Sequence, residues 1–266
     1  MSYSGKSIVI TGASDGIGAE LARQLASEHP RLVLAARSTD RLEDVAAQCR
    51  TLGAEVEVVT ADVTLDEDCR RIAQTAIARF GGIDVLIANA GVSMHARFDE
   101  ITDFTTYERL WRINCLGTIQ CVRHAWDALK TSRGLVLGIS SLAGKIGVPA
   151  RSTYCASKFA QSGFLDALRI EAEDYGIAVS VVYPGVVATG IRRNGFNGAG
   201  ARAGVSGLDE KGAMSVAACA RQIVAAMRAR RRELVMTPRA RIGLWLKLMA
   251  PRLVDRMARA ALARPH

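Results

Sequence analysis

Short runs of apolar residues alternate along the chain with longer segments in which apolar residues recur every three or four positions. The apolar runs predict seven strands, at residues 6–11, 31–36, 55–60, 83–89, 134–140, 177–184 and 233–237. The longer segments predict helices at residues 16–28, 39–52, 65–80, 103–131, 152–175 and 214–230. Strands that are apolar along their whole length are typical of parallel sheets covered on both faces. The pattern therefore predicts an α/β fold with a Rossmann-type, doubly wound parallel sheet of seven strands.

No linker divides residues 1–237, so we expect them to form a single domain. Beyond the last predicted strand, residues 238–266 form an extension. Its pattern predicts two short helices, at 239–250 and 251–262, separated at Pro251 because proline interrupts a helix.

The net charge of +9 is concentrated at the C-terminal end, because residues 228–266 carry 11 basic and 2 acidic side chains and the rest of the chain is balanced. In the second tail helix Arg252, Arg256 and Arg259 fall on one face. The opposite face is apolar and consists of Leu253, Val254, Met257 and Ala261. A basic amphipathic helix is typical of attachment to an anionic membrane surface. Packing over the sheet edge, over the substrate entrance or at a subunit contact is the alternative. Nucleic-acid binding is not expected, since the arginines lack aromatic stacking partners.

Cysteine usage and the N-terminus bear on the compartment. The six cysteines are scattered without a CxxC pair and without histidines at metal-binding spacing, which favours a reducing compartment and predicts neither a metal site nor disulfides. The N-terminus has no signal-peptide pattern, and no apolar stretch reaches the roughly 18 residues that a transmembrane helix needs. We therefore expect a cytoplasmic protein, with peripheral membrane contact as an option through the tail.

The first predicted strand runs directly into a glycine-rich turn with the spacing Gly-x3-Gly-x-Gly. Glycines at such a turn let backbone N–H groups approach a pyrophosphate, and the N-terminus of the following helix faces the phosphates. The turn therefore predicts a dinucleotide site whose contacts come from Gly12, Ser14, Asp15, Gly16, Ile17 and Gly18.

Arg37 follows the second predicted strand, at the position where a carboxylate would select NAD through its ribose hydroxyls. A guanidinium binds phosphate oxygens through two donors at once. Arg37 therefore predicts NADP(H) as the cofactor. Asp15 is an objection, since a carboxylate near the phosphates is repulsive unless it points to solvent.

Tyr154 and Lys158 lie four residues apart in a predicted helix, so their side chains share one face. A phenol with a pKa of about 10 needs a shift of roughly 3 units, or about 4 kcal/mol, to work near neutral pH. A cation about 4 Å away supplies on the order of 4 kcal/mol at an effective dielectric of 20. The pair therefore predicts that Lys158 lowers the pKa of Tyr154, which then acts as a general acid and base.

Polar residues also follow two other predicted strands. Ser140 and Ser141 lie at the end of the fifth strand, where a hydroxyl can hold a substrate oxygen, and the NAG sequence at 89–91 follows the fourth. Asn114 lies inside a predicted helix, where Asn is unfavourable unless its amide has a partner.

These features together resemble the short-chain dehydrogenase/reductase family over residues 5–237, and the tail is similar to that of members acting on hydroxysteroids and lipid-like ketones. The motifs that carry the resemblance are TGASDGIG (11–18), Asp62, NAG (89–91), Asn114, the serine 13 residues before Tyr154, YxxxK and PGVVAT (184–189). The resemblance implies a catalytic tetrad of Asn114, Ser141, Tyr154 and Lys158. In it Tyr154 transfers the proton, Ser141 orients the substrate oxygen, Lys158 also holds the nicotinamide ribose, and Asn114 anchors a water. Ser140 is the rival for the serine role.

The resemblance further implies cofactor contacts from Asp62, Val63, Asn89, Ala90, Gly91, Tyr154, Lys158, Pro184, Gly185, Val187 and Thr189. We expect the substrate site to include Ser141, His95, Ile146, Val148 and Tyr154. The implied activity is NADP(H)-dependent interconversion of a hydrophobic ketone or aldehyde and its alcohol. A 3-oxoacyl-thioester reductase and a non-catalytic NADPH-binding sensor or scaffold are the alternatives. The family also implies a homodimer or homotetramer built on the helices at 103–131 and 152–175.

Overall fold

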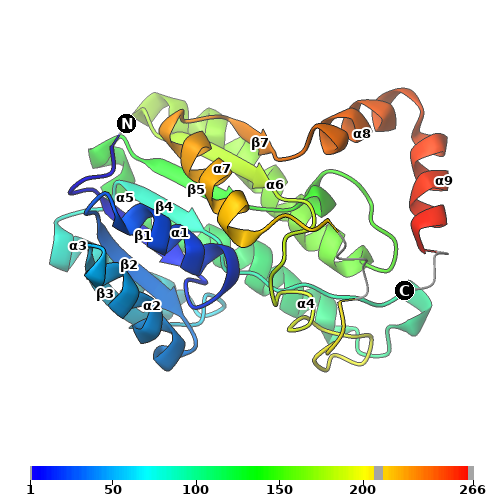
Figure 1. The fold of residues 1–266 in the computed structure, drawn as a ribbon, viewed down its shortest axis with the longest axis horizontal. Helices are drawn as coiled ribbons and strands as arrows, with labels where there is room; N and C mark the ends of the chain where they lie inside the picture. Colours follow the sequence, from blue (N-terminus) through cyan, green and yellow to red (C-terminus); the bar gives the residue numbers. More distant parts are fainter. Residues whose placement is uncertain (1, 207–211, 263–266) are drawn as a thin grey trace.

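The computed structural model describes residues 2–206 and 212–262, and it contains one seven-stranded parallel sheet. The strands are β1 (Ser7–Thr11), β2 (Arg31–Ala36), β3 (Glu55–Thr60), β4 (Val85–Ala88), β5 (Leu135–Ile139), β6 (Ala178–Tyr183) and β7 (Glu233–Val235). Their order across the sheet is β3-β2-β1-β4-β5-β6-β7, so the order reverses between β1 and β4 (Figure 1). The predicted α/β fold with a doubly wound, Rossmann-type sheet is confirmed.

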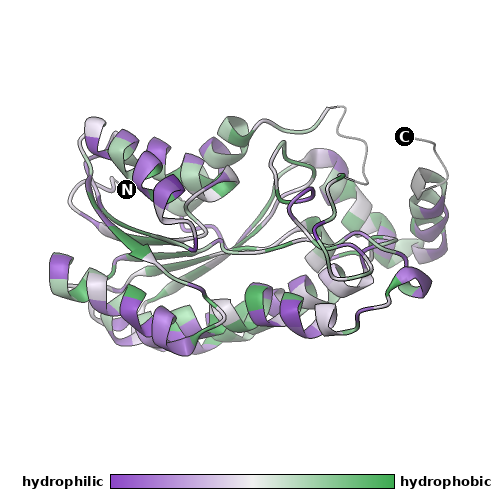
Figure 2. Ribbon diagram, turned by 90° about the horizontal axis from the view of Figure 1, so that it is seen from below, coloured by the Kyte–Doolittle hydropathy of each residue, from purple (hydrophilic) through white to green (hydrophobic). Residues whose placement is uncertain are grey.

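The helices cover both faces of this sheet (Figure 2). They are α1 (Gly16–Ala26), α2 (Thr39–Thr51), α3 (Asp66–Phe80), α4 (Thr105–Trp111), α5 (Gly117–Ser132), α6 (Ser152–Ala172) and α7 (Val216–Arg228). Short 3₁₀ turns lie at η1 (Phe98–Glu100), η3 (Leu142–Gly144) and η4 (Glu173–Tyr175). Buried side chains of α1, α2 and α7 pack on one face of the strands, and those of α3, α5 and α6 pack on the other. Because successive strand side chains point to opposite faces, both faces needed apolar residues, which explains the continuous apolar runs.

One predicted helix is interrupted in the structure. The segment 103–131 was expected to be continuous, but a π-helical turn, η2 (Arg112–Leu116), separates α4 from α5. The cause is tertiary: the Asn114 amide is held by Val92 and Ser157, and Gly117 lies so close to Val63 that an added Cβ would be 2.8 Å from its Cγ2. The prediction of a regular helix across 103–131 is therefore wrong at this turn.

The C-terminal extension forms the two predicted helices, α8 (Pro238–Met249) and α9 (Pro251–Leu262). Thr237 caps α8 by accepting a hydrogen bond from the Ala240 N–H, and Pro238 takes the first helical position. Pro251 ends the run of α8 and begins α9. Figure 1 shows that α8 leaves the end of β7 and that α9 turns sharply away from it.

Candidate active site

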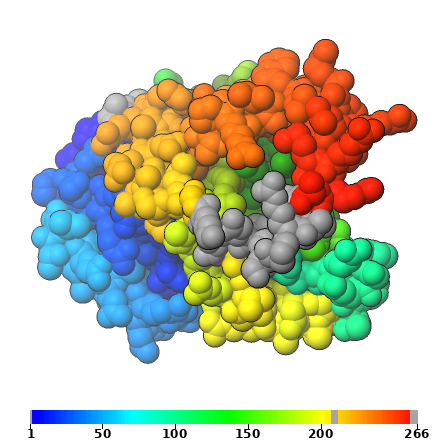
Figure 3. All heavy atoms as spheres, turned by 45° about the vertical axis from the view of Figure 1, so that its right-hand side comes forward, coloured from blue at the N-terminus to red at the C-terminus, as the bar shows by residue number. Residues whose placement is uncertain are grey.

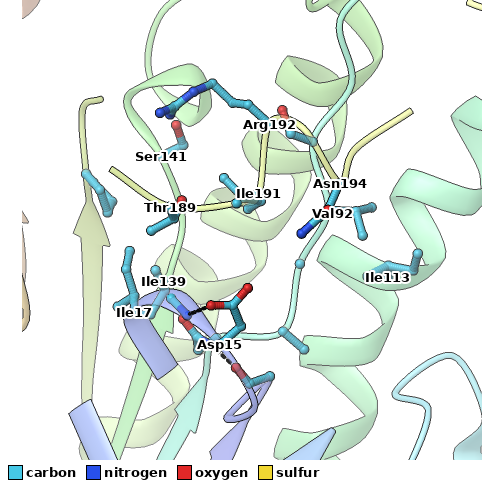
Figure 4. Close-up of a pocket in the computed structure, with 18 of the residues that line it drawn as sticks. Asp15, Ile17, Val92, Ile113, Ile139, Ser141, Thr189, Ile191, Arg192 and Asn194 are labelled. Carbon is cyan, nitrogen blue, oxygen red and sulfur yellow. Dashed lines mark hydrogen bonds between the residues drawn. The ribbon is translucent and has the colours of Figure 1, made fainter. Parts of the chain in front are cut away.

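A cavity of about 700 Å³ opens at the carboxyl ends of the strands, at the point where the strand order reverses. Ligands bind at this position in doubly wound sheets, because the loops there diverge to opposite faces. The cavity extends from the glycine turn after β1 to the N-terminal part of α6. Figure 4 shows Asp15 and Ile17 at one end and Ser141 and Arg192 at the other.

Nearly all of the residues predicted to form the site line this one cavity. From the cofactor prediction these are Gly12, Ser14, Asp15, Gly16, Ile17, Arg37, Asp62, Val63, Asn89, Ala90, Gly91, Tyr154, Lys158, Pro184, Gly185, Val187 and Thr189. From the substrate prediction they are Ser141, Ile146, Val148 and Tyr154. Gly18, Asn114 and His95 are not among the lining residues.

The glycine turn is packed closely against the end of β4. An added Cβ at Gly18 would lie 2.4 Å from the Gly12 carbonyl oxygen and 2.5 Å from Asn89 Nδ2. Asn89 Nδ2 itself donates to the carbonyl oxygens of Thr11 (2.9 Å) and Gly12 (3.0 Å). Gly18 therefore acts behind the cavity wall, where its missing side chain lets the turn and the Asn89 amide meet.

Asp15 lines the cavity and also has a structural role at the start of α1. It is the N-cap of α1, and its Oδ1 accepts a hydrogen bond from the Gly16 N–H at 2.6 Å. An acidic N-cap is favourable because the helix N-terminus carries partial positive charge. The carboxylate is thus oriented by the helix that it caps.

Two arginines lie at the outer end of the cavity, beyond the end of β2. Arg37 and Arg41 are both exposed and both line the cavity, together with Ser38, whose hydroxyl accepts a 3.2 Å hydrogen bond from Arg41 Nε. Arg37 was predicted from the sequence, whereas Arg41 was not. The sequence pattern was sufficient to predict Arg41 as well, because Arg41 lies in the first turn of the helix that follows Arg37.

At the inner end, Ser141 and Tyr154 line the cavity together, and the Ser141 hydroxyl acts to lower the pKa of the Tyr154 phenol. The Ser141 hydroxyl also accepts from the Ala143 N–H at 3.2 Å, which starts the 3₁₀ turn η3. Ser140 points away, into α6, where its hydroxyl meets Ser162 Oγ at 3.0 Å. Of the two serines, Ser141 is therefore the one placed to meet a substrate beside the phenol.

The electrostatics of Tyr154 differ from the prediction. Burial raises the pKa of this phenol, and the Ser141 hydrogen bond and the positive charges of Arg151 and Arg192 oppose that rise. Arg151 is 4% exposed and donates to Ser93 Oγ at 2.7 Å and to the Ser206 carbonyl. Arg151 was not predicted as a site residue, although it lies only three positions before Tyr154. The nearby cations that act on the phenol come from these two arginines.

Lys158 is buried beside the same cavity and has its own partners. Its Nζ donates to the Ile139 carbonyl and to Gln161 Oε1, both at 2.9 Å. Burial lowers the pKa of Lys158 to about 7. The prediction that Lys158 lowers the pKa of Tyr154 finds no support in these contacts, and the ammonium is instead held at the wall of the cavity next to Gly91, whose added Cβ would lie 3.6 Å from Nζ.

Asn114 lies in the π-helical turn, behind the cavity. Its Oδ1 accepts from the Val92 N–H at 2.8 Å, and its Nδ2 donates to the Val92 carbonyl and to Ser157 Oγ, both at 2.9 Å. π-helical turns recur at functional sites because they displace one residue out of the regular helical register. Here the displaced residue is Asn114. Its two hydrogen bonds to Val92 hold the backbone of the loop after β4, which lines the cavity at Gly91 and Val92.

The substrate end combines apolar and polar walls. Ile146 and Val148 line it as predicted, and Val92 and Asn194 add to it. His95, which was predicted at the substrate end, is not among the lining residues; its backbone N–H donates to the Phe196 carbonyl beside the Met94–Phe196 bridge. The glycine-rich loop at 185–206 supplies Arg192 and Arg202 to the lining, and Arg192 is largely buried.

Two other properties of the described residues bear on chemistry. No group of three or more His, Cys, Asp or Glu side chains within residues 2–206 and 212–262 is arranged to hold a metal ion. No helix in those same ranges is long and apolar enough to cross a membrane.

A Rossmann-type sheet whose glycine turn and Ser–Tyr pair share one cavity is the architecture of a nicotinamide-dependent oxidoreductase. The sequence profile of the family described as short chain dehydrogenase matches residues 6–199. The chain therefore belongs to the short-chain dehydrogenase family, whose members use a nicotinamide cofactor, and the predicted resemblance to hydroxysteroid dehydrogenase-like members is confirmed.

Three known proteins show the extent of the similarity. The chain is 32% identical over 267 residues to the dehydrogenase/reductase SDR family protein 7-like of Dictyostelium discoideum, covering 96% of this chain and 81% of that protein. It is 37% identical over 262 residues to 11-beta-hydroxysteroid dehydrogenase A of Sesamum indicum, covering 94% and 74%. Among solved structures, an alcohol dehydrogenase of the archaeon Thermococcus sibiricus complexed with 5-hydroxy-NADP matches with a TM-score of 0.77 and 27% identity, covering 87% of this chain and 95% of that one.

Proposed function

We propose that this protein is an NADP(H)-dependent oxidoreductase that interconverts a hydrophobic ketone or aldehyde and its alcohol. The observation that carries the proposal is the single cavity in which Arg37 and Arg41 lie at one end and Ser141 and Tyr154 at the other. NADPH, when bound, supplies a hydride to the carbonyl carbon, and NADP⁺ accepts it in the reverse direction. The named activities of two relatives, a hydroxysteroid dehydrogenase and an alcohol dehydrogenase complexed with an NADP derivative, support the same reading.

The chain's own residues would handle the proton. The Tyr154 hydroxyl donates its proton to the substrate oxygen as the carbonyl is reduced, and the phenolate takes a proton from the alcohol in the reverse direction. Ser141, which lines the same end of the cavity as Tyr154, would orient the substrate oxygen beside it. Lys158, whose Nζ lies next to Gly91 at the cavity wall, is placed to hold the nicotinamide ribose.

NADP(H) selection would come from the two arginines after β2. Each guanidinium can donate two hydrogen bonds to a 2′-phosphate, and no carboxylate among the cavity-lining residues lies at the end of β2. The apolar residues Ile146 and Val148, which line the cavity, favour a hydrophobic carbonyl compound as the substrate.

The test is a panel of steroid, aliphatic and aromatic ketones and aldehydes assayed in parallel with NADPH and NADH. Tyr154→Phe should abolish carbonyl-dependent NADPH oxidation and leave NADPH binding intact. Arg37→Ala combined with Arg41→Ala should raise the KM for NADPH by about tenfold to a hundredfold, since charge-assisted hydrogen bonds are worth roughly 1.5–3 kcal/mol. The KM for NADH serves as the control and should hardly change. Turnover by Tyr154→Phe, or equal loss with both cofactors, would refute the proposal.

A further inference from the structure

The last two helices form an arm that projects from the body of the protein, and we define the arm as residues 238–262 (Figure 3). Lys247 attaches the arm to the body on one side of α8, and Arg241 attaches it near the start of that helix. Lys247 Nζ donates to the Lys145 carbonyl at 2.8 Å and lies 5.5 Å from the centre of the Phe159 ring. Arg241 Nε donates to the Val235 carbonyl at 3.0 Å. Figures 1 and 2 both show α9 standing clear of the helical layers.

The other side of α8 is apolar and exposed. Ile242, Trp245, Leu248 and Met249 are between 67% and 83% exposed, and the α9 residues Leu253 and Met257 are about half exposed. These are six of the sixteen exposed large apolar side chains in the described part of the chain, although the arm contributes only 25 residues. Scattered apolar side chains are normal on a protein surface, but a concentration of this kind marks an interaction site.

The charge of the arm identifies the kind of partner. It carries six basic side chains (Arg239, Arg241, Lys247, Arg252, Arg256 and Arg259) and one acidic one, Asp255. All five arginines are exposed. A long arginine side chain can lie along an apolar surface and keep its guanidinium at a polar boundary, and an indole ring favours the same boundary. An apolar face edged by arginines is therefore complementary to a surface that is anionic outside and apolar beneath.

We propose that the α8–α9 arm docks this protein on the surface of an anionic phospholipid bilayer. The arm lies in the interface and does not cross it, because each helix has 12 residues and is about 18 Å long, against a hydrocarbon core of roughly 30 Å. A second copy of the arm is a poor partner, because it would bring two sets of like charges together. The exposed arginines of the arm would supply the electrostatic attraction to the bilayer. Its exposed apolar side chains would supply the apolar burial.

The position of the arm connects docking to the cavity. Lys247 is bonded to the carbonyl of Lys145, and the next residue, Ile146, lines the substrate end of the cavity. Docking would hold that end close to the bilayer, where apolar carbonyl compounds accumulate. This consequence rests on the proposed function, whereas docking itself does not.

The experiment is co-sedimentation of the full-length protein with two kinds of vesicle, phosphatidylcholine alone and phosphatidylcholine mixed with phosphatidylserine. The protein should sediment with the anionic vesicles at low salt, and the bound fraction should fall as salt is added. Arg252→Glu with Arg256→Glu should reduce the partition coefficient at least about tenfold, since each basic residue near such a surface is worth about 1 kcal/mol. Trp245→Ser with Leu248→Ser should reduce it through loss of apolar contact.

Matched controls come from other helices. Arg221→Glu on α7 changes an exposed arginine, and Ile77→Ser on α3 changes an exposed apolar residue. Both should bind vesicles like the unaltered protein, and circular dichroism checks that every variant is folded.

The proposal is overturned if the unaltered protein stays in the supernatant with anionic vesicles, or if the controls lose as much binding as the arm variants. It is also overturned if the arm variants instead change the sedimentation coefficient of the free protein, which would identify a second copy as the partner. NADPH oxidation with a water-soluble carbonyl compound should be unaltered throughout, so a failure of docking is distinguishable from a failure of the proposed function.

Discussion

At the scale of single residues, the phenol of Tyr154 is influenced by groups from several elements. Burial raises its pKa, the Ser141 hydroxyl and the Arg151 and Arg192 guanidiniums oppose the rise, and Cys155 adds to it. Alcohol oxidation needs the phenolate, so its rate should increase with pH through the pKa of this phenol.

Replacing Arg151 with Gln removes a buried positive charge and keeps an amide that can reach Ser93. The pKa of Tyr154 should then rise, so the pH profile of kcat/KM for alcohol oxidation should move to higher pH. Arg151→Lys keeps the charge and should leave the profile near its original position. A profile that does not move in the Gln variant, or moves equally in both, would show that Arg151 is only structural.

Lys158 has a consequence for stability. Burial lowers its pKa from 10.5 to about 7, so between those values the unfolded chain binds more protons at this position than the folded protein. The free energy of unfolding therefore rises with pH between about 7 and 10.5. The contribution of Lys158 to it is fully present above pH 10.5 and is lost as the pH falls toward 7. The unaltered protein should gain stability relative to Lys158→Met as the pH is raised from 7 to 9.5, by up to about 1.4 kcal/mol per unit. Urea unfolding of both proteins at several pH values measures this, and parallel curves would contradict it.

Much of the site at this scale could be predicted from the sequence, because the chemistry depends on fixed spacings. Tyr154, Lys158 and Ser141 follow from the helical period and from the end of a strand. Arg151 could not be assigned in the same way, since an arginine at a helix start is ordinarily solvated. It is buried and held by partners distant in the chain, Ser93 at 58 positions and Ser206 at 55 positions.

At the scale of elements, the strands were predictable because both of their faces are buried, so burial alone determines their composition. The π-helical turn was not, because it depends on the hydrogen bonds of Asn114 to Val92 and Ser157. A helix in isolation would favour the regular i to i−4 pattern at that point. The interruption is thus set by the packing of η2 against the β4 loop and α6, which no local pattern records.

The glycine turn after β1 gives a testable case at this scale. An alanine at position 18 would place its Cβ against the Gly12 carbonyl and the Asn89 amide, which are hydrogen-bonded to each other. Gly18→Ala should therefore displace the turn, lower the free energy of unfolding by about 1–3 kcal/mol and weaken NADPH binding. Gly243→Ala in α8 is the control, because an added Cβ there meets nothing within 4 Å. Urea unfolding and fluorescence titration with NADPH measure both effects, and unchanged binding by Gly18→Ala would refute the role given to this glycine.

At the scale of the whole molecule, the charge is distributed unevenly: the first 227 residues are balanced and the remaining 39 carry the entire excess of +9. Sheet and cavity therefore belong to a part of the protein without strong net charge, and the basic character belongs to the end of the chain and to the arm. This separation lets the exposed arginines of the arm be altered without changing the charge balance of the part that carries the sheet and the cavity. Lys247 links the arm to the body, because its Nζ lies 5.5 Å from the centre of the Phe159 ring on α6.

A subunit contact is expected on the helices α4, α5 and α6, and α6 offers a suitable surface. Phe159 and Ile170 lie 11 positions apart, about three helical turns, so they share one face, and they are 42% and 68% exposed. In a twofold contact each residue occurs twice, so one introduced charge enters the interface as a like-charged pair. Ile170→Arg should therefore convert a dimer or tetramer to a smaller species in sedimentation equilibrium, and Ile77→Arg on α3 should not.

A protein that is monomeric before substitution, or an Ile170→Arg variant with unchanged mass, would place the contact elsewhere or exclude it. Because α6 also carries Tyr154 and Lys158, loss of the contact should lower kcat if the helix needs its partner to hold the site, and this activity can be measured in the same samples.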